Sequence, residues 1–130
     1  MSKRNKIIIG LLILFLLGIA VFLKVNFSDG YKISIANNTN KIVRDLEIRY
    51  KTGGVIIQRI SQIEAKHSWK YTIDTNNIQS ENAIILKYKD NKGNSYEEYI
   101  VGYLEKGYSG NVNVTINNID KNGKLDMKIK

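Results

Sequence analysis

One uninterrupted apolar segment limits what this chain can fold into more than any other feature of its sequence. Residues 7–23 read IIIGLLILFLLGIAVFL and contain no charged or strongly polar side chain. As an α-helix this segment is roughly 25 Å long, and its extension to Phe27 reaches roughly 31 Å, which matches the hydrocarbon thickness of a bilayer. A surface helix of a soluble protein has a polar stripe, and this segment has none. We therefore predict a transmembrane helix over residues 7–26, with the lipid bilayer as its partner.

Basic residues flank this segment unevenly and predict its orientation. Three precede it and one follows it closely: Lys3, Arg4 and Lys6, then Lys24. Basic residues beside a membrane span stay preferentially in the cytoplasm. The sequence therefore predicts a single-pass protein of the plasma membrane, with residues 1–6 as a cytoplasmic tail and residues 27–130 as one extracytoplasmic domain.

A cleaved signal peptide is the alternative interpretation of the same segment. Cleavage requires small residues at alternate positions before the cut, and only Gly18 and Ala20 provide them. Both lie inside the apolar run, before Val21, Phe22 and Leu23. Their position favours a signal anchor that is retained, and both interpretations export the domain that follows.

The composition of the exported part argues against several classes of function. The chain has no cysteine, so it offers neither a disulfide nor a thiolate, and a single histidine, His67, cannot make a zinc site or a triad by itself. The net charge is +8, but basic and acidic side chains are mixed outside the anchor. Nucleic-acid binding favours a dense basic patch with interleaved aromatic residues. We therefore expect no cofactor, no metal and no nucleic acid. We interpret the mixed charges first as a well-solvated surface, and an anionic envelope polymer or lipid headgroups as more plausible partners than nucleic acid.

Alternation of apolar and polar residues dominates the sequence after Gly30, as is typical of half-buried strands. The apolar positions of the main runs are Ile33 and Ile35; Ile48 and Tyr50; Trp69, Tyr71 and Ile73; Ile84, Leu86 and Tyr88; Val112, Val114 and Ile116; and Leu125, Met127 and Ile129. Turn-forming Gly, Asn and Asp residues separate several of these runs, at 52–54, 90–94 and 120–123. Seven or eight short strands predict an all-β fold, an antiparallel β-sandwich of the immunoglobulin or fibronectin type.

The segment from residue 42 to residue 51 predicts a strand with one charged face. Its inward residues are expected to be Ile42, Leu46, Ile48 and Tyr50, and its outward residues Val43, Asp45, Glu47, Arg49 and Lys51. The stretch Ile33–Tyr50 resembles the first two strands of bacterial immunoglobulin-like ectodomains, in which an Asn-rich turn precedes a strand with inward Leu, Ile and Tyr. The resemblance implies an architecture and no particular function.

The acidic residues and the Asp-containing turns predict neither a catalytic nor a calcium site. Glu97 and Glu98 are neighbours on a predicted strand, so they point to opposite faces. The turns at 90–94 and 120–123 depart from the EF-hand pattern, since Lys92 stands where an oxygen ligand is required. We interpret both as hairpin turns, and we place His67 in a surface loop.

The segment Gly102–Gly110 is the strongest candidate for a binding site. It combines three glycines, two tyrosines and an acid–base pair between two predicted strands. Tyrosine contributes a large contact area at low entropic cost. The candidate partner-binding residues are Tyr96, Tyr99, Tyr103, Glu105, Lys106 and Tyr108. Packing of these tyrosines at a corner of the sandwich is the alternative.

Together these features predict a membrane-anchored, non-enzymatic binding or accessory protein. Its partner is another membrane protein, an envelope polymer, or a secreted peptide or toxin that the domain intercepts in an immunity-type role. One alternative is an envelope glycan-active enzyme that uses scattered Asp and Glu residues, which requires two carboxylates facing one cleft at about 5 to 10 Å. Another is a structural subunit of a larger membrane complex.

Overall fold

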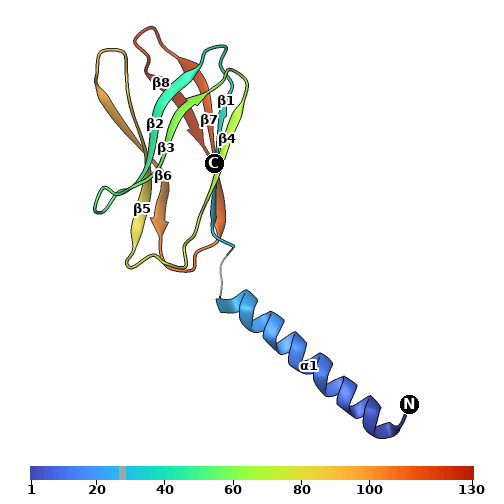
Figure 1. Cartoon of the computed structure of the whole chain (residues 1–130). Helices are drawn as coiled ribbons and strands as arrows, with labels where there is room; N and C mark the ends of the chain where they lie inside the picture. Colours follow the sequence, from blue (N-terminus) through green and yellow to red (C-terminus); the bar gives the residue numbers. More distant parts are fainter. Residues whose placement is uncertain (27–28) are drawn as a thin grey trace.

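The computed structural model describes residues 1–26 and 29–130, and in this part of the chain one helix precedes eight strands (Figure 1). The helix is α1 (Lys3–Asn26). The strands are β1 (Tyr31–Asn37), β2 (Val43–Tyr50), β3 (Ile56–Ile63), β4 (Ser68–Ile73), β5 (Asn82–Lys89), β6 (Ser95–Leu104), β7 (Gly110–Ile119) and β8 (Leu125–Ile129). The predicted start of the domain at residue 27 lies outside the described residues.

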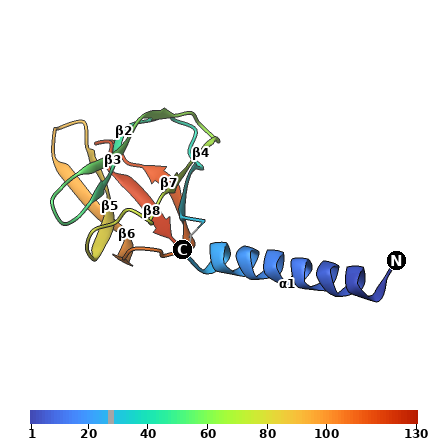
Figure 2. The same cartoon turned by 60° about the horizontal axis from the view of Figure 1, so that its bottom comes forward.

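Helix α1 extends away from the strands in Figures 1 and 2, and its apolar span is not buried against the rest of the described chain. By length and composition it can cross a bilayer, a property that membrane anchors and signal sequences share. Between residues 7 and 23 its surface has no charged or strongly polar side chain on any side, so no face of this span is suited to water. The prediction of one apolar N-terminal helix is confirmed.

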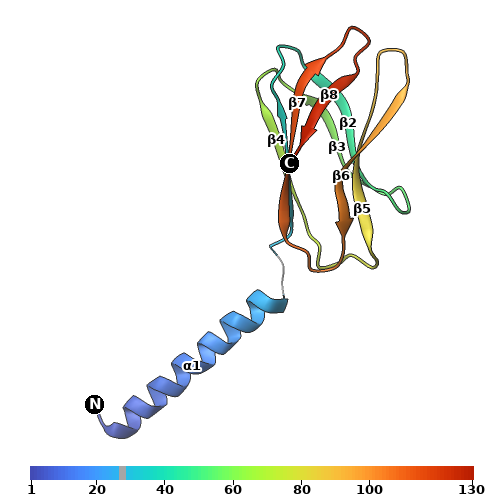
Figure 3. The ribbon, with the colours of Figure 1, turned by 180° about the vertical axis from the view of Figure 1, so that it is seen from behind.

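The strands form two sheets that pack face to face, as Figures 2 and 3 show. Sheet A has the order β4-β1-β7-β8, and sheet B has the order β3-β2-β5-β6. Every neighbouring pair is antiparallel except β1 and β7, which run parallel. The predicted all-β domain, with eight strands in two mainly antiparallel sheets, is therefore confirmed.

The core lies between the two sheets and consists mainly of branched aliphatic side chains from their central strands. Its most buried members are Ile33 and Ile35 on β1, Val114 and Ile116 on β7, Leu46 and Ile48 on β2, and Ile84 and Leu86 on β5. These are the inward positions of the alternating runs. Each such side chain contributes about 1.5–3 kcal/mol when it leaves water.

The strand order corrects the predicted immunoglobulin-like arrangement. In the immunoglobulin order the first two strands share a sheet, whereas β1 lies in sheet A and β2 in sheet B. The buried Asn37 at the end of β1 fixes this crossing. Its Nδ2 donates to the main-chain oxygens of Lys41 (2.8 Å) and Ile63 (3.0 Å), and its Oδ1 accepts from the Thr39 hydroxyl (2.7 Å). The turn after β1 is thereby tied to the end of β3, in the opposite sheet.

Strand β2 changes phase at Asp45, where φ is 56°. This left-handed conformation is unusual inside a strand, although Asp tolerates it better than most residues. Because it shifts the alternation by one residue, Val43 and Leu46 both point into the core and Val43 is 3% exposed, whereas Ile42 is 39% exposed. The predicted inward position of Ile42 and outward position of Val43 are therefore wrong.

The two ends of the sandwich have different surroundings. The chain enters β1 from α1 at one end, which we call the helix end, and the opposite end is the far end (Figure 1). The helix end carries the loops 51–55, 74–81 and 105–109, and the far end carries 38–42, 64–67, 90–94 and 120–124. Four residues separate Asn26 from Tyr31, so the two residues lie at most about 18 Å apart.

Candidate functional site

The six tyrosine-loop residues that the sequence predicts as a binding site do not form one surface. Tyr96 stands at the start of β6, towards the far end, and Tyr99 follows on the outer face of sheet B. The other four lie at the helix end, at the close of β6 and in the loop that follows it. Because β6 runs the length of the sandwich, its tyrosines are spread from one end to the other.

Tyr96 has a structural role in the hairpin between β5 and β6. Its ring stacks on Tyr88 with 5.2 Å between centroids, and its hydroxyl donates to Asp90 Oδ2 over 3.2 Å. Asp90 also accepts from the amide nitrogens of Lys92 and Asn94, each over 2.9 Å. Hydrogen bonding, led by the Asn94 side chain, lowers the pKa of Asp90. The segment 90–94 is thus a carboxylate-capped turn, as predicted.

The residues at the helix end form a compact tyrosine cluster. The Tyr103 hydroxyl donates to Glu105 Oε2 over 2.9 Å, and its ring meets that of Tyr108 edge-on with 5.5 Å between centroids. Hydrogen bonding to Glu81 and then to Glu105 raises the pKa of Tyr103. Thr75 Oγ1 donates to the Tyr108 main-chain oxygen over 2.6 Å, which ties this loop to the β4–β5 loop. Packing therefore accounts for much of the motif.

Part of the tyrosine cluster still faces water. Tyr103 is 44% exposed and Tyr108 is 37% exposed, and Lys106 is exposed beside them. The cluster sits at the helix end, next to the short connection to α1. A partner that uses it must therefore approach close to the point where the domain joins the helix.

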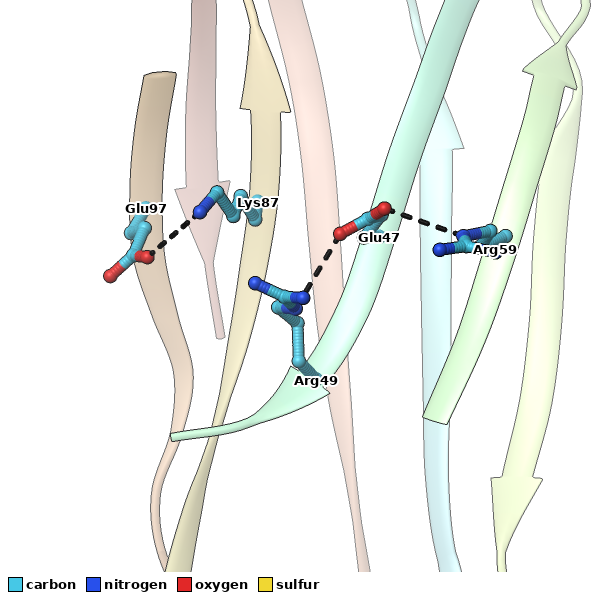
Figure 4. Close-up of polar contacts among 5 residues, drawn as sticks. All are labelled: Glu47, Arg49, Arg59, Lys87 and Glu97. Carbon is cyan, nitrogen blue, oxygen red and sulfur yellow. Dashed lines mark hydrogen bonds and ion pairs between the residues drawn. The ribbon is translucent and has the colours of Figure 1, made fainter. Parts of the chain in front are cut away.

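Tyr99 lies beside a different feature on the outer face of sheet B. This feature is a row of charged residues, most of which Figure 4 shows. The row runs over four neighbouring strands with alternating sign: Arg59, Glu47, Lys87 and Glu97. Glu47 lies 3.4 Å from Nε of Arg59 and of Arg49, and Glu97 lies 3.6 Å from Nζ of Lys87 and 3.0 Å from Nζ of Lys51. We call this set, with Arg49 and Lys51, the charge ladder.

Each cation of the charge ladder is paired with one of its two glutamates. A hydrogen bond from Lys51 is the main cause that lowers the pKa of Glu97, and the same bond raises the pKa of Lys51. Tyr99 is 55% exposed and places its ring 5.5 Å from Lys51 Nζ, opposite the buried Ile85. Cross-strand pairs of this kind stabilise a sheet. The ladder is therefore better suited to holding sheet B together than to attracting a charged ligand.

A cavity lies towards the far end, where sheet B divides. Strand β2 pairs with β5 only from Glu47 to Tyr50, and beyond that point the two strands separate. The gap is a cleft of about 490 Å³ with an apolar part and a charged rim. Its lining includes Ile42, Arg44, Asp45, Lys89, Ile119 and Leu125.

Two local structures separate the strands at this cleft. On one side, the left-handed Asp45 bends β2 so that it continues along β3 alone. On the other side, the β5–β6 hairpin is bound to the β7–β8 turn: Asn91 N donates to Asn122 O over 2.8 Å, and Leu125 N donates to the Tyr88 hydroxyl over 3.1 Å. Strained backbone beside a cavity is a frequent feature of functional sites.

This cleft is not among the sites predicted from the sequence, although the sequence contains one signal for it. The inward residues Val43 and Leu46 are three positions apart, not two, which breaks the period of a regular strand. An Asp between them is a residue that tolerates positive φ. Their spacing indicates the bend in β2, but the separation from β5 depends on the distant contacts of the β5–β6 hairpin.

Metal ligation has no support in the described part of the chain, where no group of three His, Cys, Asp or Glu side chains is placed to hold an ion. His67 lies in the exposed connection between β3 and β4, as predicted, with Nδ1 2.9 Å from the Ala65 main-chain oxygen.

Comparison with known proteins yields no family for this chain. No protein-family description matches its sequence, and no curated protein matches it. A solved structure, described as the NMR structure of the protein from Eubacterium rectale, is similar to it with 16% sequence identity and a TM-score of 0.48, over 76% of this chain and 86% of that chain. Similarity at this level identifies neither a family nor a function.

Proposed function

We propose that this chain is a single-pass membrane-anchored, non-enzymatic binding protein whose domain lies outside the cytoplasm and receives a protein partner in the far-end cleft. The observation that carries the proposal is the cleft itself, which combines apolar side chains with a charged rim at the end farthest from α1. A binding pocket commonly has this composition. The far end is also the end that a partner reaches without contacting the bilayer.

The anchor supports this role in two ways. The basic residues in the first turns of α1, before its apolar span, favour a cytoplasmic N-terminus and hence an exported domain. The short connection to β1 keeps the cleft within one domain length of the membrane, so a partner in the same membrane meets it at high effective concentration. A contact of modest affinity is then sufficient for a stable complex.

An extended polypeptide segment is the partner that suits the cleft best. Where β2 and β5 separate, no strand pairing joins them in the described residues, so each presents a main-chain edge to the gap. Edges of this kind bind peptides by adding a strand to the sheet. Ile42 and Leu125 offer apolar contacts, and Arg44, Asp45 and Lys89 offer charges of both signs.

The carboxylates around the cleft favour binding over glycan hydrolysis. A glycosidase needs one carboxyl group with a raised pKa as its general acid. Of the acidic residues that line the cleft, Glu47 is paired with two arginines, and hydrogen bonding lowers the pKa of Asp90. Among the carboxylates that line the cleft, Asp45 is then left for a catalytic role, whereas glycan hydrolysis requires two carboxyl groups.

Crosslinking on intact cells tests the proposed function. A membrane-impermeant crosslinker applied from outside is expected to couple the full-length protein to its partner. The Ile42→Asp variant is expected to lose about tenfold or more of this product, since a charge placed in a desolvated apolar contact costs over about 1.4 kcal/mol. Val55→Asp is the matched control, because Val55 is an exposed aliphatic residue at the helix end.

Two outcomes would contradict this proposal. If the wild-type protein is crosslinked only after the cells are permeabilised, the domain lies in the cytoplasm. If Ile42→Asp and Val55→Asp retain the product equally, the cleft is not the binding site. Circular dichroism of both purified full-length variants checks that the domain remains folded.

A further inference from the structure

The outer face of sheet A carries lysines without acidic partners. Lys32 on β1, Lys70 on β4 and Lys128 on β8 alternate with inward residues and are exposed. Lys130 continues β8, since its main-chain N and O both pair with Asn113 of β7, over 3.0 Å and 2.9 Å. The four lysines therefore stand on the same side of one sheet. We call this surface the lysine face.

Short polar side chains occupy the positions between these lysines. They are Ser34, Ser68, Thr72, Asn111, Asn113 and Thr115. A shallow depression of about 290 Å³ lies over β4, β1 and β7. Its outward side chains are Lys32, Ser34, Lys70, Thr72, Asn111 and Asn113. Because the neighbours are short, the ammonium groups stand above a surface of hydroxyl and amide donors.

The charges of the lysine face are not compensated within the protein. No ion pair involves any of its four lysines in the residues that the structure describes. The acid on this face, Asp126, lies opposite Asn118 of β7 and two residues before Lys128, nearer the far end than the four lysines. Uncompensated like charges on one face add their potentials and raise the local concentration of anions.

The spacing of the lysine face suits an extended ligand. Outward residues of one strand recur about every 7 Å, and neighbouring strands are about 4.8 Å apart. Register places Lys70, Ser34 and Asn113 in one row with Lys130, and Lys32 one row nearer the helix end. A ligand with regularly repeated anionic groups contacts several lysines at once, and each further contact is intramolecular.

We propose that the lysine face binds a linear polyanion, a chain of repeated phosphodiester or carboxylate groups. A polymer is favoured over the bilayer surface because the outward positions of this face hold no aromatic or large aliphatic residue, with Ala36 as their one apolar side chain, among the described strands of sheet A. Surfaces that lie on a membrane use such residues to enter the headgroup layer. This surface is distinct from the far-end cleft.

Titration of the full-length protein in nanodiscs of zwitterionic lipid tests this proposal. The probes are poly(glycerol phosphate) for phosphodiesters and polygalacturonate for carboxylates. The variant Lys32→Gln/Lys70→Gln/Lys130→Gln is expected to weaken binding of at least one probe about tenfold or more at low salt, with a shallower dependence of affinity on salt. The control variant is Lys92→Gln/Lys106→Gln/Lys121→Gln, which removes the same charge from exposed loops. It is expected to change affinity less than about threefold.

Three results would overturn the proposal: no binding of either polymer to the wild-type protein at low salt, equal losses in the two triple variants, or stronger binding to anionic vesicles than to either polymer. The last result would assign the face to the bilayer. The Ile42→Asp variant is expected to bind the polymers as the wild-type protein does. Failure of the cleft proposal and failure of the polymer proposal are therefore distinguishable.

Discussion

The outer faces of the two sheets contain similar cations in opposite arrangements. On sheet B, each cation of the charge ladder is paired with Glu47 or Glu97, and Figure 4 shows the pairs of Arg49, Arg59 and Lys87. On sheet A, the cross-strand neighbours of the lysines are Ser, Thr and Asn, and Asp126 lies two residues before Lys128 on β8. The row Arg59, Glu47, Lys87, Glu97 thus has its counterpart in Lys70, Ser34, Asn113, Lys130.

This difference shows that net charge is a poor guide to where a protein attracts anions. The charged side chains of the ladder form contacts within sheet B, each of which contributes about 0.2–1 kcal/mol to stability. The lysine face gains no such stabilisation, and its charges stay available to a ligand. The two faces therefore differ in pairing: the cations of the charge ladder have carboxylate partners, whereas the lysines of the lysine face have no ion pair among the described residues.

Copying the ladder onto sheet A is the change with the largest expected effect. The variant Ser34→Glu/Asn113→Glu places a carboxylate beside Lys70 and another beside Lys130. We expect polyanion affinity to fall about a hundredfold at low salt, because the lysines then pair with the new carboxylates and no longer attract the polymer. Titration with poly(glycerol phosphate) measures this fall.

The uncharged variant Ser34→Thr/Asn113→Gln is the control for this copy, since it enlarges both side chains without adding charge. If the glutamate variant keeps wild-type affinity, the lysines of sheet A do not form the binding surface. Urea unfolding of both variants shows whether the new pairs also add stability to sheet A, as the comparison of the faces implies.

Opening the ladder on sheet B is expected to have a moderate effect on stability. In Glu47→Gln, Arg49 and Arg59 lose their ion-pair partner, and Arg49 Nε is a buried nitrogen. We expect the free energy of unfolding to decrease by about 1 kcal/mol. Urea denaturation of the full-length protein measures it. Asp126→Asn on the exposed face of sheet A is the control and should have no measurable effect; equal losses in both variants would refute the distinction between the faces.

The pH dependence of the ladder is the smallest expected effect. The pKa of Glu97 is lowered from its ordinary value of 4.5, chiefly by the hydrogen bond from Lys51. A carboxyl with a lowered pKa stabilises the fold above its unfolded pKa, and this contribution is lost as pH falls through the folded pKa. Thermal unfolding at about pH 6 and about pH 3 should therefore show a smaller loss for Glu97→Gln than for the wild-type protein. An equal loss in both proteins would show that Glu97 is not part of the acid response.

The local features of the fold were predictable because they depend on neighbouring residues. Alternation at Ile33 and Ile35, or at Val112 and Val114, identifies a strand and its inward face. The turn at 90–94 follows from Asp90 and Gly93, which has a φ of 84°. The apolar run that becomes α1 is equally local.

The strand order and both proposed sites were harder to predict from the sequence, because they depend on residues that are far apart in it. The parallel pairing of β1 with β7 joins residues about eighty positions apart, such as Ile33 and Val112, and no local pattern specifies it. The lysine face needs that pairing, since its lysines come from three strands. The tyrosines were predicted as one site because they are close in sequence, but β6 carries them to different ends.

The parallel pairing of β1 with β7 also sets the order in which an exported chain is able to fold. In the exported topology that we propose, all strands of sheet B have left the membrane once Leu104 is translocated, whereas sheet A waits for β7 and β8. Beside the bilayer, β1 is therefore held with one open edge until the chain has been exported past residue 110. Closing so long a loop is slow. Translocation and folding of this protein are thus coupled through its first strand, and an export arrest before β7 leaves that edge open to pairing with another chain.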